Sequence, residues 1–509
     1  MKKILKYIAV TGLASAMLVS CNMDLVPIDS ITYEEGGQLI STQTALNAME
    51  NGLLTSFRSL QMGEFSITSE LMMDGFNATL DYGNNYGGIH RVTSNDFTSG
   101  DYYVEDYWAY NYSAIKNYNI FIAAAENVPE DLQDAANVVL GEAYFFRAMS
   151  YLNLARHFGK AYNAASAATD LCVPKVEVYD QLAKPERATV KDIYELVKSD
   201  LDHAATLLAN VKGVKRPVDS KDAAKATKPS IDAVNALYAR YYIDIADYGK
   251  AAEYAHKVID SGNYALAKSA EEMTAEYVND AGSEPIYQVY TNKSSEGSNA
   301  NSLWTYYTAD NNKGKVFKPY YIPTQKLIDS YEAGDLRLAA WYDKAEWVQL
   351  NGSYYQGDFY VFTKYWGNPA LTSALRNGRQ CPKPLMIGEM YLIAAEAELN
   401  GNLPGAKDDL NALQTARGAS ATDATMENIR NEWFKETVGE GLRMVTMKRW
   451  GLGYNGRPMQ PGAANALNQG ENYELKNLPA TDHHFCWPVP SHEMNINKNL
   501  VQNPGYADL

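Results

Sequence analysis

The helical character of this chain is clearest in residues 140–159, which read LGEAYFFRAMSYLNLARHFG. Alanine and large apolar or aromatic residues recur there at helical spacing, and the pattern extends back to Ala135. Gly159 ends it, and Arg156 and His157 lie in the last turn, where cationic side chains suit the helix dipole. The pattern predicts an amphipathic helix over residues 135–158.

Other segments repeat this arrangement of small and large apolar residues on one face. They are residues 190–208, 231–245, 250–259, 386–399 and 405–417. Short turns at residues 247–249 and 400–404 join four of them into pairs. Helix pairs with alanine at the contact face resemble the tetratricopeptide plan, in which stacked pairs build a common core. We therefore expect a mainly α fold, in which tetratricopeptide-like helix pairs form a scaffold with long irregular loops and few short strands.

Long stretches without clear periodicity separate the predicted helices. They are residues 63–101, 161–187, 209–229 and 268–323. Connections of this length are usually functional or contain elements that periodicity does not reveal.

The amino terminus has the order of a bacterial secretory signal. Three lysines precede a mostly apolar run at residues 8–19, which is shorter than the ~20 residues that span a bilayer. The sequence LVSC at residues 18–21 resembles the lipobox of bacterial lipoproteins. We expect residues 1–20 to be a signal peptide and Cys21 to carry the lipid that anchors the mature protein to a membrane. An ordinary signal peptide followed by a chance cysteine is the alternative.

Composition excludes some partners. The 509 residues carry a formal net charge of −16, which argues against nucleic acid or anionic lipid as a ligand. The remaining cysteines, Cys172, Cys381 and Cys486, lack metal-finger spacing, so we interpret them as buried free thiols and leave one disulfide open. Tyrosine is abundant, with 38 residues against 13 phenylalanines, and its apolar ring and hydroxyl suit sugars as well as helix packing.

Five motifs follow one another along the chain. They are EAYFFRA with YLNLARHFG (142–159), YGKAA with VIDSGNYAL (248–266), EMYL with AAEA (389–397), EGLR with KRW (440–450), and WPVPSHEMN with NLVQNPGY (487–506). With the lipobox, they resemble the SusD/RagB family of Bacteroidetes outer-membrane lipoproteins. The resemblance implies a single SusD-like domain over residues 21–509. Met386 and Thr446 stand where relatives often carry arginine and aspartate, so a different internal pairing is expected there.

The resemblance also implies a function. Such proteins are surface lipoproteins that bind oligosaccharide and act with a SusC-type TonB-dependent outer-membrane transporter in its uptake, and they break no bonds. Two alternatives stay open. One is a peptide-binding lid of the same transporter class, and the other is a structural or adhesive surface lipoprotein.

Two tyrosine-rich stretches are the candidate ligand-binding segments, at residues 74–91 and 290–310. Sugars stack on aromatic rings and exchange hydrogen bonds with amide and charged side chains. The predicted stacking residues are Trp304, Tyr86, Tyr82 and Tyr307. The predicted hydroxyl partners are Asn84, Asn85, Arg91 and Asn301.

No catalytic residues are predicted. The sequence contains no Gly-x-Ser-x-Gly elbow, phosphate loop or His-Glu-x-x-His motif. The resemblance implies that Glu389, Glu396, Glu436 and Glu440 are internal partners of arginines such as Arg147 or Arg443. His483, His484 and His492 are irregularly spaced, so we predict no metal and no cofactor, although structural calcium stays open.

Overall fold

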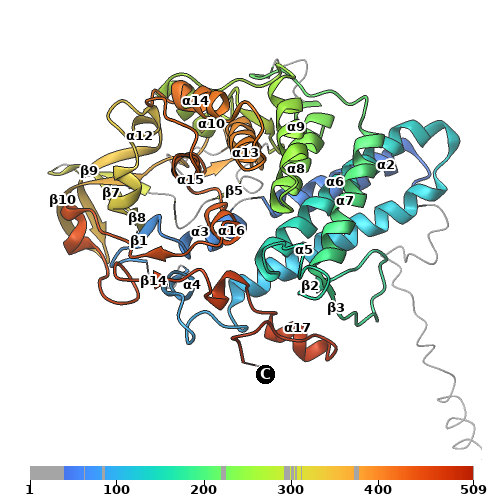
Figure 1. Cartoon of the computed structure of the whole chain (residues 1–509), viewed down its shortest axis with the longest axis horizontal. Helices are drawn as coiled ribbons and strands as arrows, with labels where there is room; N and C mark the ends of the chain where they lie inside the picture. The colour runs from blue at the N-terminus through green and yellow to red at the C-terminus, as the bar shows by residue number, and fades with distance from the viewer. Residues whose placement is uncertain are drawn as a thin grey trace, which may run out of the picture.

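The computed structural model describes residues 39–61, 63–82, 86–218, 225–291, 303, 312–371 and 378–507, with the backbone of 298–299 and 306–310 (Figure 1). The predicted signal peptide and Cys21 lie outside these residues.

A row of packed helices forms the scaffold. In chain order its members are α5 (Tyr102–Ala124), α6 (Gln133–Phe158), α7 (Val190–Leu207), α8 (Ile231–Asp244), α9 (Tyr248–Ile259), α13 (Ile387–Asn400) and α14 (Ala406–Ala416). Each helix packs on the next, and α13 packs directly on α9 although residues 260–386 intervene. Figure 1 shows α5 to α9 on one side of the molecule and α13 and α14 beside α9.

Local sequence explains where these helices begin and end. A capping box starts α7, in which Thr189 and Asp192 each bond the other's backbone amide. Gly159 caps α6. The mainly α, helix-pair fold is therefore confirmed, and the predicted helix boundaries lie within two residues of the observed ones.

The other α-helices fill the stretches that lacked periodicity or cover the scaffold. They are α2 (Gln43–Ser59), α3 (Glu64–Leu71), α4 (Gly87–Arg91), α10 (Ala270–Val278), α11 (Gln325–Asp329), α12 (Leu336–Trp341), α15 (Met426–Glu436), α16 (Arg443–Arg449) and α17 (Ser491–Ile496).

Most strands are short. The largest sheet is a mixed four-stranded sheet of order β10-β9-β7-β6, at the left of Figure 1. Its strands are β6 (Tyr306–Asp310), β7 (Gly314–Lys318), β9 (Tyr342–Leu350) and β10 (Ser353–Phe362). The others form two-stranded ribbons: β1 (Phe76–Ala78) with β8 (Tyr321–Pro323), β2 (Leu171–Pro174) with β3 (Arg187–Thr189), β4 (Pro285–Tyr287) with β12 (Leu385–Met386), β5 (Ser298–Asn299) with β11 (Arg379–Gln380), and β13 (Tyr454–Asn455) with β14 (Asn477–Leu478).

The hairpin of β9 and β10 was not predicted, although its turn carries a recognisable signal. Asn351 and Gly352 both have positive φ, at 48° and 79°, and join strands that face each other from Leu350 and Ser353 outward. An Asn-Gly pair between alternating apolar residues is a strong hairpin signal.

Buried ion pairs hold the scaffold together, and their partners differ from those expected. The four motif glutamates are internal, but Arg147 pairs with Asp200 and Arg443 with Asp74. The observed pairs are Glu389 with Arg240, Glu396 with Arg449, Glu436 with Arg417 and Arg337, and Glu440 with Lys364. Helical periodicity predicts which side chains face inward but not which distant side chain they meet.

Candidate functional site

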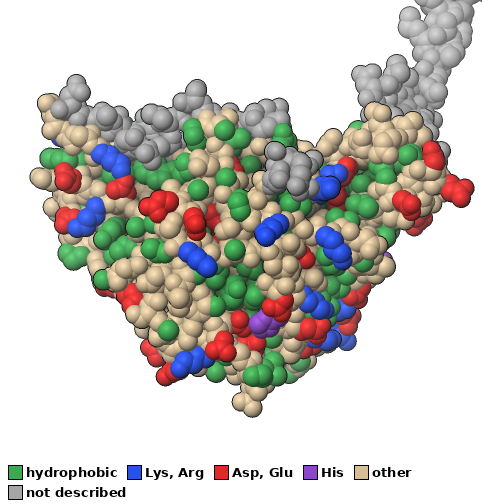
Figure 2. All heavy atoms as spheres, turned by 90° about the horizontal axis from the view of Figure 1, so that it is seen from above, with side chains coloured by type: hydrophobic (Ala, Val, Ile, Leu, Met, Phe, Trp, Pro, Cys, Tyr) green, Lys and Arg blue, Asp and Glu red, His purple; other side chains and the backbone are tan. Residues whose placement is uncertain are grey.

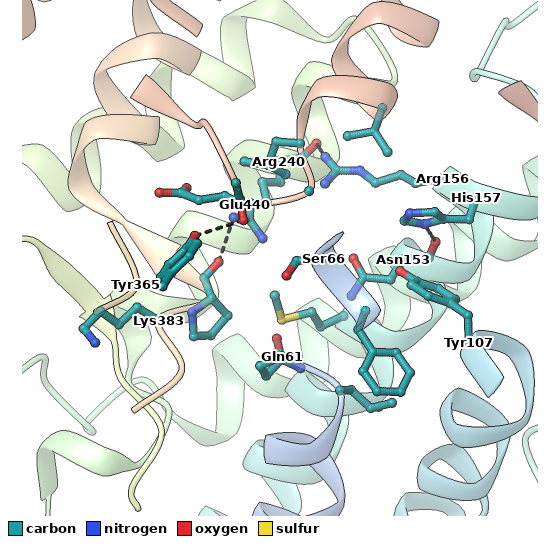
Figure 3. Close-up of a pocket in the computed structure, with 18 of the residues that line it drawn as sticks. Gln61, Ser66, Tyr107, Asn153, Arg156, His157, Arg240, Tyr365, Lys383 and Glu440 are labelled. Carbon is teal, nitrogen blue, oxygen red and sulfur yellow. Dashed lines mark hydrogen bonds between the residues drawn. The ribbon is translucent and has the colours of Figure 1, made fainter. Parts of the chain in front are cut away.

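A polar pocket lies where α3, α6, α8 and the segment after α15 come together (Figure 3). Its volume is about 80 Å³. Its polar lining is Gln61, Ser66, Asn153, Arg156, His157, Arg240, Gln380, Lys383 and Glu440, and its rings are Phe65, Tyr107, Tyr277 and Tyr365. Figure 3 shows Tyr365 and Glu440 on one side of this space and Asn153, His157 and Tyr107 on the other, with Ser66 and Gln61 between them. Rings with amides nearby suit a ligand that has both CH faces and hydroxyls.

Each of the two arginines of the pocket forms an ion pair with a carboxylate. Arg156 Nε lies 2.7 Å from Asp244 Oδ2, and Arg240 makes a bidentate pair with Glu389 at 2.5 and 2.6 Å. Arg240 also donates to the carbonyl oxygen of Pro384 at 2.7 Å, a bond drawn in Figure 3. Because these cations already have carboxylate partners, neither adds net charge to the pocket.

The other charged groups are paired as well. Lys383 Nζ lies 2.7 Å from Asp280, and Lys364 Nζ lies 2.7 Å from Glu440. Burial raises the pKa of Glu440, while Lys364 partly offsets that effect. Glu440 is the one carboxylate among the described residues that line the pocket, whereas glycoside hydrolysis uses two across the scissile bond. The arrangement suits binding of a neutral, hydroxyl-rich ligand better than acid–base chemistry.

His157 is held neutral at the pocket wall. Burial lowers its pKa to about 3. Its Nδ1 donates to Asn153 at 2.8 Å, because the partner atom is a carbonyl oxygen, which can only accept. The ring packs between Tyr107 and Trp487, with centroids 4.4 and 4.6 Å away.

The predicted ligand-binding stretch 290–310 leaves the scaffold beside this pocket. Gln380, which lines the pocket, pairs with Ser298 in the β11–β5 ribbon. The amide of Val289 donates to the carbonyl oxygen of Pro382 at 2.9 Å, and Arg58 donates to that of Tyr290 at 3.1 Å. The start of this stretch is therefore anchored on two segments that form the pocket wall.

The structure describes three of the ligand-binding residues predicted in the amino-terminal stretch, and two of them are in contact. Arg91 donates to the Tyr82 hydroxyl at 2.6 Å and pairs with Asp96 at 2.9 Å. Tyr82 is half-buried, and its hydroxyl also lies 3.1 Å from that of Tyr473. Tyr86 is 4% exposed and stacks on Tyr103 with centroids 3.8 Å apart, so one face of its ring is already occupied.

The remaining predicted residues give less structural information. Tyr307 belongs to β6, of which the structure describes the backbone. Trp304, Asn301, Asn84 and Asn85 lie outside the described residues. Ligand binding by the eight residues stays a prediction. The pocket residues were not predicted, because they come from helices whose periodicity indicates only that they face inward.

A second, larger groove of about 700 Å³ lies near the carboxyl end. Lys160, Asn163, Arg187, Asp482 and His483 are among its lining residues. This size falls in the 300–1,000 Å³ range of small-molecule sites, whereas the polar pocket is smaller. The polar pocket can therefore receive only part of an oligosaccharide, with the rest on the surface around it.

Charge is evenly mixed on the face shown in Figure 2. Acidic and basic side chains alternate there around apolar ones, without a continuous basic patch. Among the described residues, no helix is long and apolar enough to cross a membrane.

A helical scaffold with an amphipathic, charge-balanced pocket and an aromatic-rich excursion at its wall defines a class of binding protein. Comparisons with known proteins show which proteins this chain resembles. Residues 28–243 match the model of a SusD-like family described as "Starch-binding associating with outer membrane". This part of the chain is therefore similar to the SusD-like family.

Relatives match nearly the whole chain. SusD-like protein P2 of Formosa agariphila is 25% identical over 96% of this chain and 97% of its own length. A putative sugar binding protein from Bacteroides vulgatus superposes with a TM-score of 0.73 at 22% identity, covering 92% of this chain and all of its own. Surface glycan-binding protein A from Bacteroides fluxus gives 0.68 at 20% identity, with the same coverage. These structures share the fold.

The matched family model is described as starch-binding and as associating with the outer membrane. A SusD-like protein from Bacteroides fragilis, 18% identical to this chain, is described as carbohydrate binding. The prediction of a binding protein agrees with both descriptions.

Proposed function

We propose that this chain is a surface-exposed outer-membrane lipoprotein that captures an oligosaccharide and passes it to a SusC-type TonB-dependent transporter. The pairing of Gln380 with Ser298 carries the proposal for the binding site, because it joins the polar pocket to the aromatic-rich stretch 290–310. The sugar chain lies along this stretch, and one end or branch enters the pocket.

The charge balance of the pocket supports a neutral glycan as the ligand. A peptide of ordinary composition brings charged termini and side chains. The cations of the pocket already form ion pairs within the protein, so they are poor partners for these charges. The test is a binding screen of the chain carrying Cys21→Ser, by calorimetry against neutral glycans, charged glycans and peptides. Binding of a neutral glycan at micromolar to millimolar Kd is expected. Binding of peptides alone would favour the alternative peptide-binding lid.

Anchoring and delivery need their own experiments. Acylation at Cys21 predicts that the protein from its native host carries fatty acids on its first residue and that Cys21→Ser releases it from the membrane. Partnership with a transporter predicts that the two proteins purify together from outer membranes in mild detergent. Failure to acylate or to co-purify would remove those parts of the proposal and leave glycan binding untouched.

A further inference from the structure

Three helices of the scaffold bring one histidine and two carboxylates together. His256 belongs to α9, Glu398 to α13 and Asp409 to α14. His256 Nε2 lies 2.9 Å from Glu398 Oε1 and 3.2 Å from Asp409 Oδ2. One donor atom from each of the three residues lies within 4.8 Å of the other two.

The carboxylates of this cluster are buried but incompletely satisfied. Glu398 is 4% exposed and Asp409 8%. Glu398 Oε2 and Asp409 Oδ2 are buried oxygens without a hydrogen-bond partner among the described residues, since the approach of His256 to Asp409 is an ion-pair contact only. Buried carboxylate oxygens are normally satisfied, so two such oxygens in one cluster favour a bound cation.

The carboxylates of the cluster have His256 as their one cationic partner, because among the described residues neither Glu398 nor Asp409 forms an ion pair with a lysine or arginine. A dication bound at Nε2 of His256 would add positive charge beside both carboxylates, and the protons that it displaces would pass to solvent.

The geometry points to a divalent transition-metal site, with Zn²⁺ as the best-suited ion, held by His256 Nε2 and one oxygen each of Glu398 and Asp409. Zn²⁺ binds nitrogen and oxygen at about 2.0–2.2 Å, so tetrahedral ligands lie about 3.4 Å apart. The two distances from His256 Nε2 are within about half an ångström of that value. One imidazole with two carboxylates suits zinc better than calcium, which prefers oxygen ligands alone.

The site has an entry path and a structural role. The His256 side chain is 34% exposed, so an ion can enter from solvent and keep water in the fourth position. The ligands come from α9 and from the α13–α14 pair, which residues 260–386 separate in sequence. A bound ion would therefore link the α8–α9 pair to the α13–α14 pair, which pack on each other although they are far apart in sequence.

The test is a metal titration of the full-length chain carrying Cys21→Ser, purified without a polyhistidine tag and freed of metal by chelation. We expect Zn²⁺ to bind at one ion per chain in calorimetry and to raise the Tm, with Co²⁺ giving the visible absorption of a tetrahedral site. Ca²⁺ and Mg²⁺ should not compete at equal concentration. His256→Gln should lower the Zn²⁺ affinity at least about tenfold and abolish the Co²⁺ spectrum.

Two matched variants test whether Zn²⁺ binds at a different histidine of the chain. His203→Gln removes an exposed histidine on α7 outside the cluster and should bind Zn²⁺ like the parent chain. His483→Gln tests the other grouping, Asp482 with His483 and His484, and should also leave the one-to-one binding intact. If His256→Gln does not fold by circular dichroism, Asp409→Asn replaces it. No Zn²⁺ binding at millimolar concentration, or unchanged affinity in a folded His256→Gln or Asp409→Asn variant, would overturn the proposal.

Discussion

Arg417 and Glu284 form a bidentate ion pair at 2.6 and 2.8 Å, although 133 residues separate them in sequence. Arg417 is fully buried, and its Nε donates to Glu436 at 3.0 Å. Burial alone would raise the pKa of Glu436, but Arg417 lowers it to about 2. One guanidinium thus links the strand region before β4, the end of α14 and the end of α15.

Removing this guanidinium should be strongly destabilising. Arg417→Leu leaves two buried carboxylates without their main counter-charge, and we expect the free energy of unfolding to fall by about 3–5 kcal/mol in urea denaturation. Lys407→Ala, which breaks an exposed pair with Asp423, is the control and should leave the urea midpoint unchanged. Equal effects of the two substitutions would show that burial does not decide the contribution of these pairs.

Trp304→Ala tests the proposed glycan surface. Loss of a stacking ring should weaken oligosaccharide binding in calorimetry, while the Tm stays nearly unchanged. Tyr179→Ala removes an exposed ring from the connection between β2 and β3 and should leave the affinity unchanged. Unaltered affinity of Trp304→Ala would remove this residue from the site.

Asn153→Ala tests whether the polar pocket takes part in binding. Losing one hydrogen bond to a sugar hydroxyl costs about 0.5–1.5 kcal/mol, which corresponds to an affinity about two- to twelvefold lower. Asn163→Ala is the matched change in the larger groove near the carboxyl end and should have no effect. If Asn163→Ala weakens binding and Asn153→Ala leaves the affinity unchanged, the binding site would be in that groove instead.

The buried His157 side chain should make the stability of the protein depend on pH. Because burial lowers its folded-state pKa to about 3, the unfolded chain binds one more proton than the folded chain between that value and about 6.5. Its contribution is therefore fully present above pH 6.5 and falls as pH drops, by up to about 1.4 kcal/mol per pH unit. His157→Gln should be less stable at pH 7 but should show a shallower loss between pH 6.5 and 3. The same slope in both proteins would contradict this account.

Gly141 allows α6 and α7 to pack closely. A Cβ at this position would lie 2.8 Å from Leu208 Cγ and 3.0 Å from Leu207 Cβ. Gly141→Val should therefore lower stability by about 1–3 kcal/mol despite removing a helical glycine. Gly249→Ala in α9 meets nothing within 4 Å and should be neutral or stabilising by up to about 1 kcal/mol. A Tm of Gly141→Val at or above that of the parent chain would show that the interface can adjust.

The helix pairs could be predicted from the sequence because helical periodicity and end signals are local. Residues 140–159 alone contain the apolar spacing, the final cations and the terminal glycine that define α6. The turn at Asn351–Gly352 was equally local, so the missed hairpin reflects an overlooked signal rather than missing information.

Only the tertiary structure decided which helices become neighbours and which charges meet. The packing of α13 on α9, the pairs of Arg240 with Glu389 and of Arg417 with Glu284, and the cluster around His256 all join residues more than 100 positions apart. Spacing within a helix indicates that a polar residue faces inward. It carries no information on the distant partner, because that partner depends on how whole helices stack.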